Sequence, residues 1–144
     1  MNATLLVTIL AVGAPALKDP PKKDVNIVGE WVVESQTSGG AMTKSAIPQT
    51  YTFAADGTWT VARGGKAMGK INRTYTLDKT TNPASIDLKT SAAAARPSML
   101  GIVKVEHDVL TLCYSRGGED RPTKFESPED SSIILIVLRR VKKD

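Results

Sequence analysis

Apolar and polar residues alternate with a period of two along much of the chain from residue 26 onward. In the stretch NIVGEWVVESQT, Ile27, Gly29 and Trp31 fall on one face, whereas Glu30 and Glu34 fall on the other. Successive side chains of a β-strand point to opposite faces, so a half-buried strand shows this period. Because the two glutamates need water, the stretch predicts a first strand whose Trp31 face points into the core.

Turn residues divide the rest of the chain into further segments of this kind. Asp-Gly and Gly-Gly pairs supply the positive φ angles that tight hairpins need, and they predict turns at 55–57 and 64–65. A hairpin is also expected at 106–108, and residues 38–48 are expected to form a loop. The predicted later strands cover residues 49–54, 58–63, 68–77, 85–89, 99–106, 109–115 and 132–141, with a short extended piece at 123–125.

This pattern predicts an all-β fold. Connections are short, and neither an amphipathic helix nor βαβ alternation is found inside the domain, so about eight strands should form an antiparallel meander. The last strand, 132–141, is apolar on both faces until Arg139 and Arg140, which makes it unsuitable as an exposed edge. Pairing it with the first strand would close the meander into a β-barrel.

The first 25 residues have a different composition. Residues 5–17 form an uncharged apolar run that is too short to span a bilayer and ends in the small-x-small sequence Ala14-Pro15-Ala16. A charged, proline-containing segment follows. We expect a signal peptide at 1–16, an extended linker at 17–25 and one barrel domain at 26–144, although a buried N-terminal strand or helix is the alternative for the apolar run.

A signal peptide would place the mature protein outside the cytoplasm, in the periplasm, the cell envelope or the medium. The 144 residues suffice for one core and carry a net charge of +4. The basic residues are scattered, with small clusters only at 22–23, 139–140 and 142–143. A nucleic-acid partner would want a concentrated basic face, so none is expected, and the mature chain is predicted to be a monomer without a membrane span.

Residues suited to catalysis are few. Cys113 and His107 are the only cysteine and the only histidine, which excludes an intrachain disulfide, a multi-cysteine zinc site and most histidine-based triads. His107 is expected at a solvated hairpin tip, and Cys113 as a packed thiol within a strand, or one available for intermolecular pairing. Glu119 and Asp120 are the alternative for a loop-based hydrolase. We predict no catalytic residue, metal or cofactor.

Five stretches, in order and spanning residues 28–140, carry a resemblance to a known family. They are VGEWVVES at 28–35, NPASIDL at 82–88, LGIVKVEHDVLTLCYS at 100–115, RPTKF at 121–125 and LRR at 138–140. They resemble the small, largely uncharacterised lipocalin-like domain that is abundant in planctomycete bacteria. The resemblance implies a lipocalin-like barrel, an extracytoplasmic setting for many members and no established activity. The SAAAARPS stretch departs from it by being less polar than expected.

The wider resemblance is to calycin barrels, which pair Gly-x-Trp on the first strand with an arginine near the end of the last. Gly29 and Trp31 match the first part, and either Arg139 or Arg140 matches the second. A guanidinium over the indole ring would contribute about 0.5–2 kcal/mol. The implied role is structural, at the closed end of the barrel. Within RPTKF, Arg121-Pro122 is predicted to fix its loop against the barrel.

Aromatic residues on the inward faces are the candidates for a ligand site. An eight-stranded barrel is either filled by side chains or able to hold one small ligand. The residues predicted to line it are Tyr51, Phe53, Trp59, Tyr75 and Tyr114. The expected function is therefore an extracytoplasmic module that binds a small apolar or amphipathic molecule. The alternative is a filled barrel that serves protein interaction or envelope structure.

Overall fold

The computed structural model describes residues 25–68, 73–90, 98–116 and 120–142. These residues form ten β-strands and no helix, and so contain none that is long and apolar enough to cross a membrane. The strands are β1 (Gly29–Ser38), β2 (Ala41–Thr43), β3 (Gln49–Phe53), β4 (Trp59–Arg63), β5 (Lys66–Ala67), β6 (Thr74–Asp78), β7 (Ala84–Lys89), β8 (Met99–Glu106), β9 (Val109–Ser115) and β10 (Ile133–Arg140).

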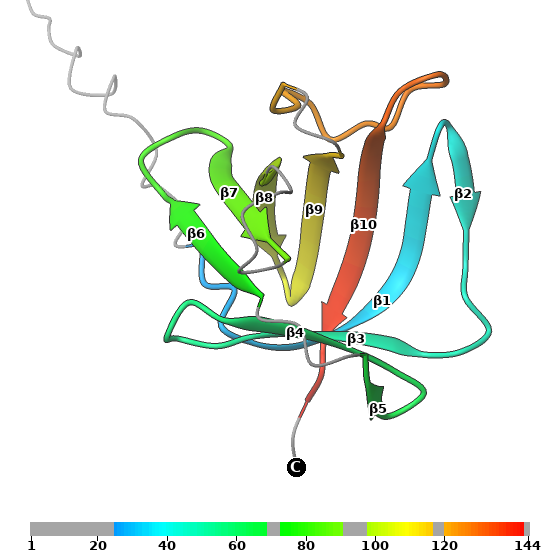
Figure 1. Cartoon of the computed structure of the whole chain (residues 1–144), viewed down its shortest axis with the longest axis vertical. Helices are drawn as coiled ribbons and strands as arrows, with labels where there is room; N and C mark the ends of the chain where they lie inside the picture. The colour runs from blue at the N-terminus through cyan, green and yellow to red at the C-terminus, as the bar shows by residue number, and fades with distance from the viewer. Residues whose placement is uncertain (1–24, 69–72, 91–97, 117–119, 143–144) are drawn as a thin grey trace, which may run out of the picture.

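The strands form one antiparallel sheet in the order β5-β4-β3-β1-β10-β9-β8-β7-β6, with the short β2 paired to β1 (Figure 1). When the short strands β2 and β5 are left aside, each strand pairs with the next one along the chain. The exception is the pair β4 and β6, which are separated by a gap. The last strand, β10, pairs with β1 from Trp31↔Arg140 to Ser38↔Ile134. The predicted all-β meander and its closure through the first and last strands are therefore confirmed.

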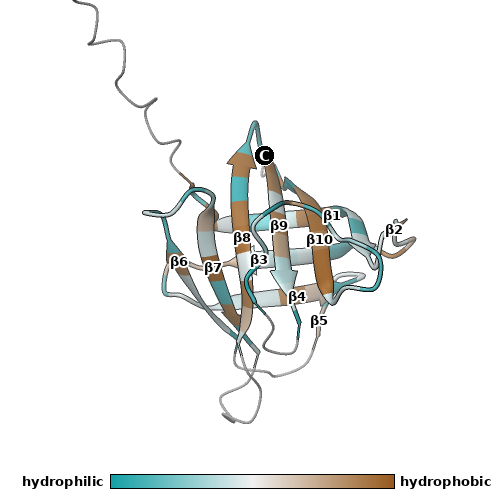
Figure 2. Ribbon diagram, turned by 90° about the horizontal axis from the view of Figure 1, so that it is seen from above, coloured by the Kyte–Doolittle hydropathy of each residue, from teal (hydrophilic) through white to brown (hydrophobic). Residues whose placement is uncertain are grey.

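The remaining gap in the barrel lies between β4 and β6. Thr58 and Thr74 form an isolated bridge, the Trp59 N–H donates to the Arg73 carbonyl at 3.1 Å, and the Tyr75 N–H donates to the Gly57 carbonyl at 2.8 Å. Seen from above, β3 and β4 cross β8–β10 at a steep angle (Figure 2). A register shift between Val33 and Ser35 allows β1 to bend and pair with both parts of the sheet.

The core fills the space between the crossing strands. Several inward side chains have no exposed area at all, namely Trp31, Ile86, Leu110, Leu112, Ile136 and Leu138. A side chain with no exposed area has no neighbouring space that could admit a water molecule. The barrel is consequently filled around these residues. The inward side chains of Met99 and Tyr114 are only partly buried. The part of the barrel interior that these two residues line is called the open half below.

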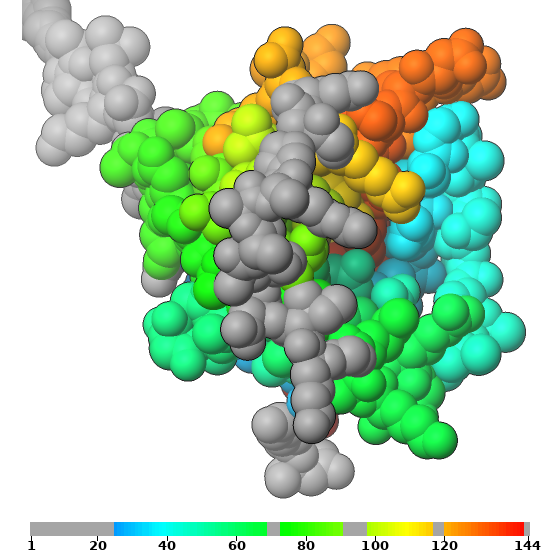
Figure 3. All heavy atoms as spheres, viewed as in Figure 1, coloured from blue at the N-terminus to red at the C-terminus, as the bar shows by residue number. Residues whose placement is uncertain are grey.

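Two loops meet at one rim of the barrel. The turn between β1 and β2 stands next to the loop that precedes β10 (Figure 3). A Cβ atom at Gly40 would lie only 2.8 Å from Cγ of Glu129. The absence of a side chain at this glycine thus allows the close approach of the two loops.

Three local predictions were wrong. Residues 68–77 are not one strand: β5 pairs with β4 for only two residues, Met68 lies outside the strands, and β6 begins at Thr74. The predicted loop 38–48 contains β2, which the turn at Gly39-Gly40 folds back onto β1. Residues 123–125 are bent instead of extended, because the Glu126 N–H donates to the Lys124 carbonyl in a tight turn. The expectations for 1–24 and for most of SAAAARPS lie outside the described residues.

Candidate functional site

The closed end of the barrel is built on Trp31. The Arg140 guanidinium lies 4.2 Å from the centre of the Trp31 ring and donates to the backbone carbonyls of Val28 and Asn26 at 3.2 and 3.3 Å. The indole Nε1–H donates to the Ile27 carbonyl at 2.8 Å. Arg140 is thus the arginine that packs on the tryptophan, and its hydrogen bonds hold residues 26–28 across this end.

The neighbouring positions explain why Gly29 and Arg139 do not share this role. Gly29 has a φ of +135°, a region open almost only to glycine, and a Cβ there would lie 3.0 Å from Nη1 of Arg140. Arg139 points to the other face of β10 and forms an ion pair with Glu34. Gly29, Trp31 and Arg140 therefore form one structural unit, whereas Arg139 lies on the surface.

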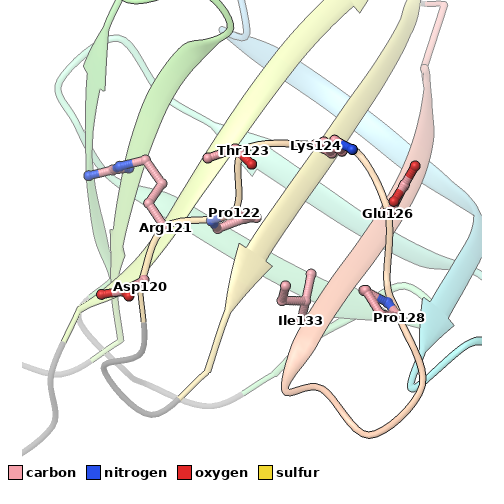
Figure 4. Close-up of a pocket in the computed structure, with 8 residues that line it drawn as sticks. All are labelled: Asp120, Arg121, Pro122, Thr123, Lys124, Glu126, Pro128 and Ile133. Carbon is pink, nitrogen blue, oxygen red and sulfur yellow. The ribbon is translucent and has the colours of Figure 1, made fainter.

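A second structural unit is the strap, residues 120–128, which crosses the outside of β7–β10 (Figure 4). The Arg121 guanidinium donates to the carbonyls of Ile86 and Gly101 at 3.1 and 2.7 Å and to the Asp87 carboxylate at 2.7 Å. Pro122 is buried beside it. At the other end, the Ser127 hydroxyl donates to the Ile133 carbonyl at 2.7 Å. Arg121 and Pro122 thus hold the strap against the barrel.

Two hollows lie beside these structural units. The one under the strap has a volume of about 600 Å³ and is lined by Asp120, Arg121, Pro122, Thr123, Lys124, Glu126, Pro128 and Ile133. The other, of about 700 Å³, lies between residues 25–28 and 75–80. The first contains two acidic and two basic residues, so it presents no net charge to a ligand. The Arg121 guanidinium already donates hydrogen bonds to β7 and β8, which hold the strap in place.

Cys113 lies beneath the strap on the outer face of β9. Its side chain is fully buried, and its Sγ lies 3.5 Å from the carbonyl oxygens of Lys124 and Glu126. Burial raises the pKa of the Cys113 thiol. A protonated, covered thiol is a poor nucleophile, so this cysteine packs against the strap.

The strap can be tested through this thiol. In the native protein, Cys113 is expected to resist an aromatic disulfide reagent and to react fully once the chain is unfolded. Arg121→Met removes the anchor of the strap and should speed native-state labelling by about tenfold or more, because local opening becomes easier. Arg139→Met is the matched control on the exposed ion pair with Glu34. Equal labelling rates in the two variants would contradict the anchoring role of Arg121.

Four of the predicted lining residues gather in one aromatic cluster. Trp59 stacks with Tyr51 at 5.8 Å and with Phe53 at 6.1 Å, and Phe53 meets the ring of Tyr75 edge-on at 5.3 Å. The Trp59 Nε1–H donates to the Thr74 carbonyl, and the Tyr75 hydroxyl donates to the Ala54 carbonyl. The polar atoms of Trp59 and Tyr75 are therefore satisfied within the protein, and these two residues close the β4–β6 gap.

Tyr51 differs from the rest of the cluster. It is only 7% exposed, yet its hydroxyl has no hydrogen-bond partner among the residues that the structure describes. Tyr114, Arg73 and Arg116 are near enough for their charges to act on the pKa of this hydroxyl. Since β3 and β9 are not neighbours in the sheet, the interaction between Tyr51 and Tyr114 crosses the interior of the barrel.

Burial sets the protonation state of both phenols. It raises the pKa of Tyr51 far above the ordinary value, and the two arginines lower it by less. Burial likewise raises the pKa of Tyr114, against the smaller opposing effect of the Arg116 charge. Both hydroxyls keep their protons at neutral pH and can act as donors.

No protein-family model, curated protein or solved structure matches the chain. The positions of the remaining candidate residues follow from the structure alone. His107 occupies the hairpin between β8 and β9 with a φ of +49°, Asp120 is exposed at the start of the strap, and Glu119 lies outside the described residues. Within the described ranges, no three metal-ligating side chains come together.

Sequence reasoning missed the two arginines whose charges act on Tyr51. In the sequence, Arg73 is a charged residue on the apolar face of the strand predicted at 68–77. In the structure its guanidinium lies 5.4 Å from the centre of the Trp59 ring and donates to the Met68 carbonyl at 3.2 Å. Arg116 follows Tyr114 by two residues, so strand alternation alone would have placed both on one face. This spacing of two residues was the signal in the sequence that could have linked Arg116 to the predicted lining residue Tyr114.

Proposed function

We propose that this chain is an extracytoplasmic, lipocalin-like module that binds a small apolar or amphipathic molecule in the open half of its barrel. The observation that supports this function is the buried Tyr51 hydroxyl, which lacks a protein partner among the described residues. An unsatisfied buried polar group costs about 1–3 kcal/mol, and native proteins contain few of them. A bound molecule with a polar end would satisfy this group.

The walls of the barrel support an apolar body for such a ligand. Trp59 and Val61 share the Tyr51 side of the interior, and the partly buried Met99 and Tyr114 face them from the β8–β9 side. The filled half around Ile136 limits the space, so the proposed ligand is small. The proposed module binds without catalysing a reaction and works as a monomer, with no nucleic-acid partner and no cofactor.

The alternative is an interaction module with no small-molecule ligand. Its supporting observation is the exposure of two large apolar side chains, Met42 on β2 and Ile47 in the following loop, with exposed fractions of 66% and 46%. Exposed apolar groups gathered on one surface are typical of protein interaction sites. Substituting both with serine would weaken such an interaction and would leave small-molecule binding unchanged.

A ligand carried through purification is the direct test. We expect native mass spectrometry of the full chain, purified from its own cells, to show a bound small molecule that is lost on mild denaturation. The same molecule, added back, should saturate and should change tryptophan fluorescence, because Trp59 borders the open half. A chain of bare mass, with no saturable response to apolar or amphipathic compounds, would leave the interaction module as the better proposal.

The setting outside the cytoplasm rests on residues 1–16. We expect the secreted chain to begin after the small residues at 14–16. N-terminal sequencing of the protein recovered from cells measures this directly, and an intact Met1 on the soluble protein would count against it.

A further inference from the structure

We propose that the polar end of the ligand is an oxyanion, of the carboxylate or phosphate type, bound by Arg73 and Arg116 together with the hydroxyls of Tyr51 and Tyr114. This inference rests on the proposed function and adds the chemical class of the ligand. It assigns a binding role to two arginines that neither the closed end nor the strap uses.

The first step of the argument is that the two guanidinium groups have binding capacity left. Arg73 donates one hydrogen bond to the Met68 carbonyl and lies over the Trp59 ring, and the charge of Arg116 acts on the Tyr114 hydroxyl. A guanidinium has five N–H donors, and most of those on Arg73 and Arg116 have no partner among the described residues. Neither arginine has a carboxylate partner among the described residues.

The second step concerns charge. The charges of Arg73 and Arg116 both act on the buried hydroxyl of Tyr51, so this hydroxyl lies in a positive electrostatic environment. An oxyanion bound at this hydroxyl would be attracted by both charges, whereas a neutral group would not. A guanidinium group can also bind two oxygens of a carboxylate or a phosphate at once.

The third step concerns the phenols. The Tyr51 and Tyr114 hydroxyls keep their protons at neutral pH because burial raises the pKa of both. They can therefore donate to an acceptor, and an oxyanion is acceptor-only. A ligand whose polar end is also a donor, such as an ammonium group, would meet donors and positive charges. The site thus selects for an anion by hydrogen bonding as well as by charge.

The position of these groups indicates how the ligand lies. Tyr51 stacks on Trp59 at 5.8 Å, and Trp59 carries Arg73 on its ring. The oxyanion site and the aromatic wall are consequently adjacent. The small apolar body would lie against Trp59 and Val61 while the oxyanion meets the arginines. This arrangement requires one amphipathic molecule and excludes a purely apolar one as the best ligand.

The test compares probes that differ only in the polar end. The full chain is titrated with octanoate, octyl phosphate and octan-1-ol, with tryptophan fluorescence and calorimetry as readouts. At least one of the two anions should bind about tenfold or more tighter than the alcohol, as expected for hydrogen bonds to a charged group. Octyl phosphate and octanoate separate the two oxyanion types. The preference should fall as salt is added.

Two variants locate the preference. R73Q/R116Q should remove most of the anion preference and leave the affinity for octan-1-ol unchanged, and R63Q, at an exposed arginine on β4, should behave as the wild type. Tyr51→Phe should also weaken anion binding, yet without ligand it should unfold no more easily than the wild type, since the lost hydroxyl has no partner among the described residues. This last result separates a binding role from a structural one.

The possible outcomes distinguish a failure of the oxyanion site from a failure of the proposed binding function. If octan-1-ol binds as tightly as both anions, or if R73Q/R116Q keeps the anion preference, the oxyanion site is wrong while the binding module stands. If none of the three probes binds to the wild-type chain, and none of them displaces a co-purified ligand, both the oxyanion site and the proposed function are overturned.

Discussion

Trp31→Ala is expected to lower the free energy of unfolding by about 3–5 kcal/mol, the largest loss that we predict for a single substitution. Trp31 has no exposed area, packs under the Arg140 guanidinium and donates a hydrogen bond to the Ile27 carbonyl. Its removal would leave a cavity at the closed end and release residues 26–28. Urea unfolding followed by circular dichroism measures the change.

The control for Trp31→Ala is Met42→Ala, which truncates a large side chain that is 66% exposed. It should change the free energy of unfolding by about 0.5 kcal/mol or less. Arg140→Gln should give an intermediate loss, because it removes the cation–π contact and the carbonyl hydrogen bonds but leaves the indole in place. A loss below about 1 kcal/mol for Trp31→Ala would contradict its place as the plug of the barrel.

Ile136→Ala is expected to cost about 2–5 kcal/mol, the range for deletion of a buried branched side chain from a filled core. Ile136 lies on the inward face of β10 with no exposed area, opposite Leu112 of β9. The expected loss depends on the barrel being filled at this level, since the substitution must then create a cavity. Chemical unfolding of the wild type and the variant, with equal m-values, gives the difference.

Leu135→Ala is the matched control one residue away. Leu135 points to the outer face of β10 opposite Cys113 and is half-buried. Its truncation should cost clearly less than that of Ile136. If Ile136→Ala cost less than Leu135→Ala, the interior at this level would already be empty. The limit on the size of the proposed ligand would then have to be abandoned.

These two substitutions separate the structural half of the barrel from its open half. Trp31 and Ile136 belong to the filled part, and neither lies among the residues proposed to bind the oxyanion. Their variants should consequently lose stability without a change in the preference for anions over octan-1-ol, as long as they remain folded. R73Q/R116Q should show the reverse. If every one of these variants lost both stability and anion binding, the filled half and the open half would not be separate regions.

Much of the fold could be predicted because strand alternation and turn residues act over short distances. The strands β8 and β9 begin and end at the predicted residues, and the hairpin between them uses His107 and Asp108 with positive φ angles. The closure through β10 followed from one observation, that a strand apolar on both faces cannot remain an exposed edge. Pairing with β1 and β9 satisfies both of its edges.

The failures occurred where local pattern and tertiary contacts disagree. Residues 68–77 alternate like one strand, but β5 ends at Ala67 and β6 begins at Thr74, where the backbone of Arg73 and Tyr75 bonds the start of β4. Those bonds join segments that no local pattern relates. The short β2 was missed because its three residues are all exposed and so show no alternation of burial.

The sequence by itself determined the strand periods, the turns, the antiparallel meander and the Gly-x-Trp unit with an arginine at the far end, since each depends on neighbouring residues or on one unusual strand. It could not choose between Arg139 and Arg140, because residues 133–138 are apolar at every position and do not reveal which face points inward. Only the tertiary structure decided this, by pairing Arg140 with Trp31 across β1.

The candidate ligand site belongs to the tertiary structure for the same kind of reason. Tyr51, Arg73 and Arg116 come from three segments that are separate in the sequence, and only the folded barrel brings both charges near enough to act on the Tyr51 hydroxyl. An unsatisfied hydroxyl is also invisible in a sequence, because it is defined by the partners that the folded chain fails to supply. The sequence supplied the aromatic residues, and the fold decided which of them has a polar group left to bind.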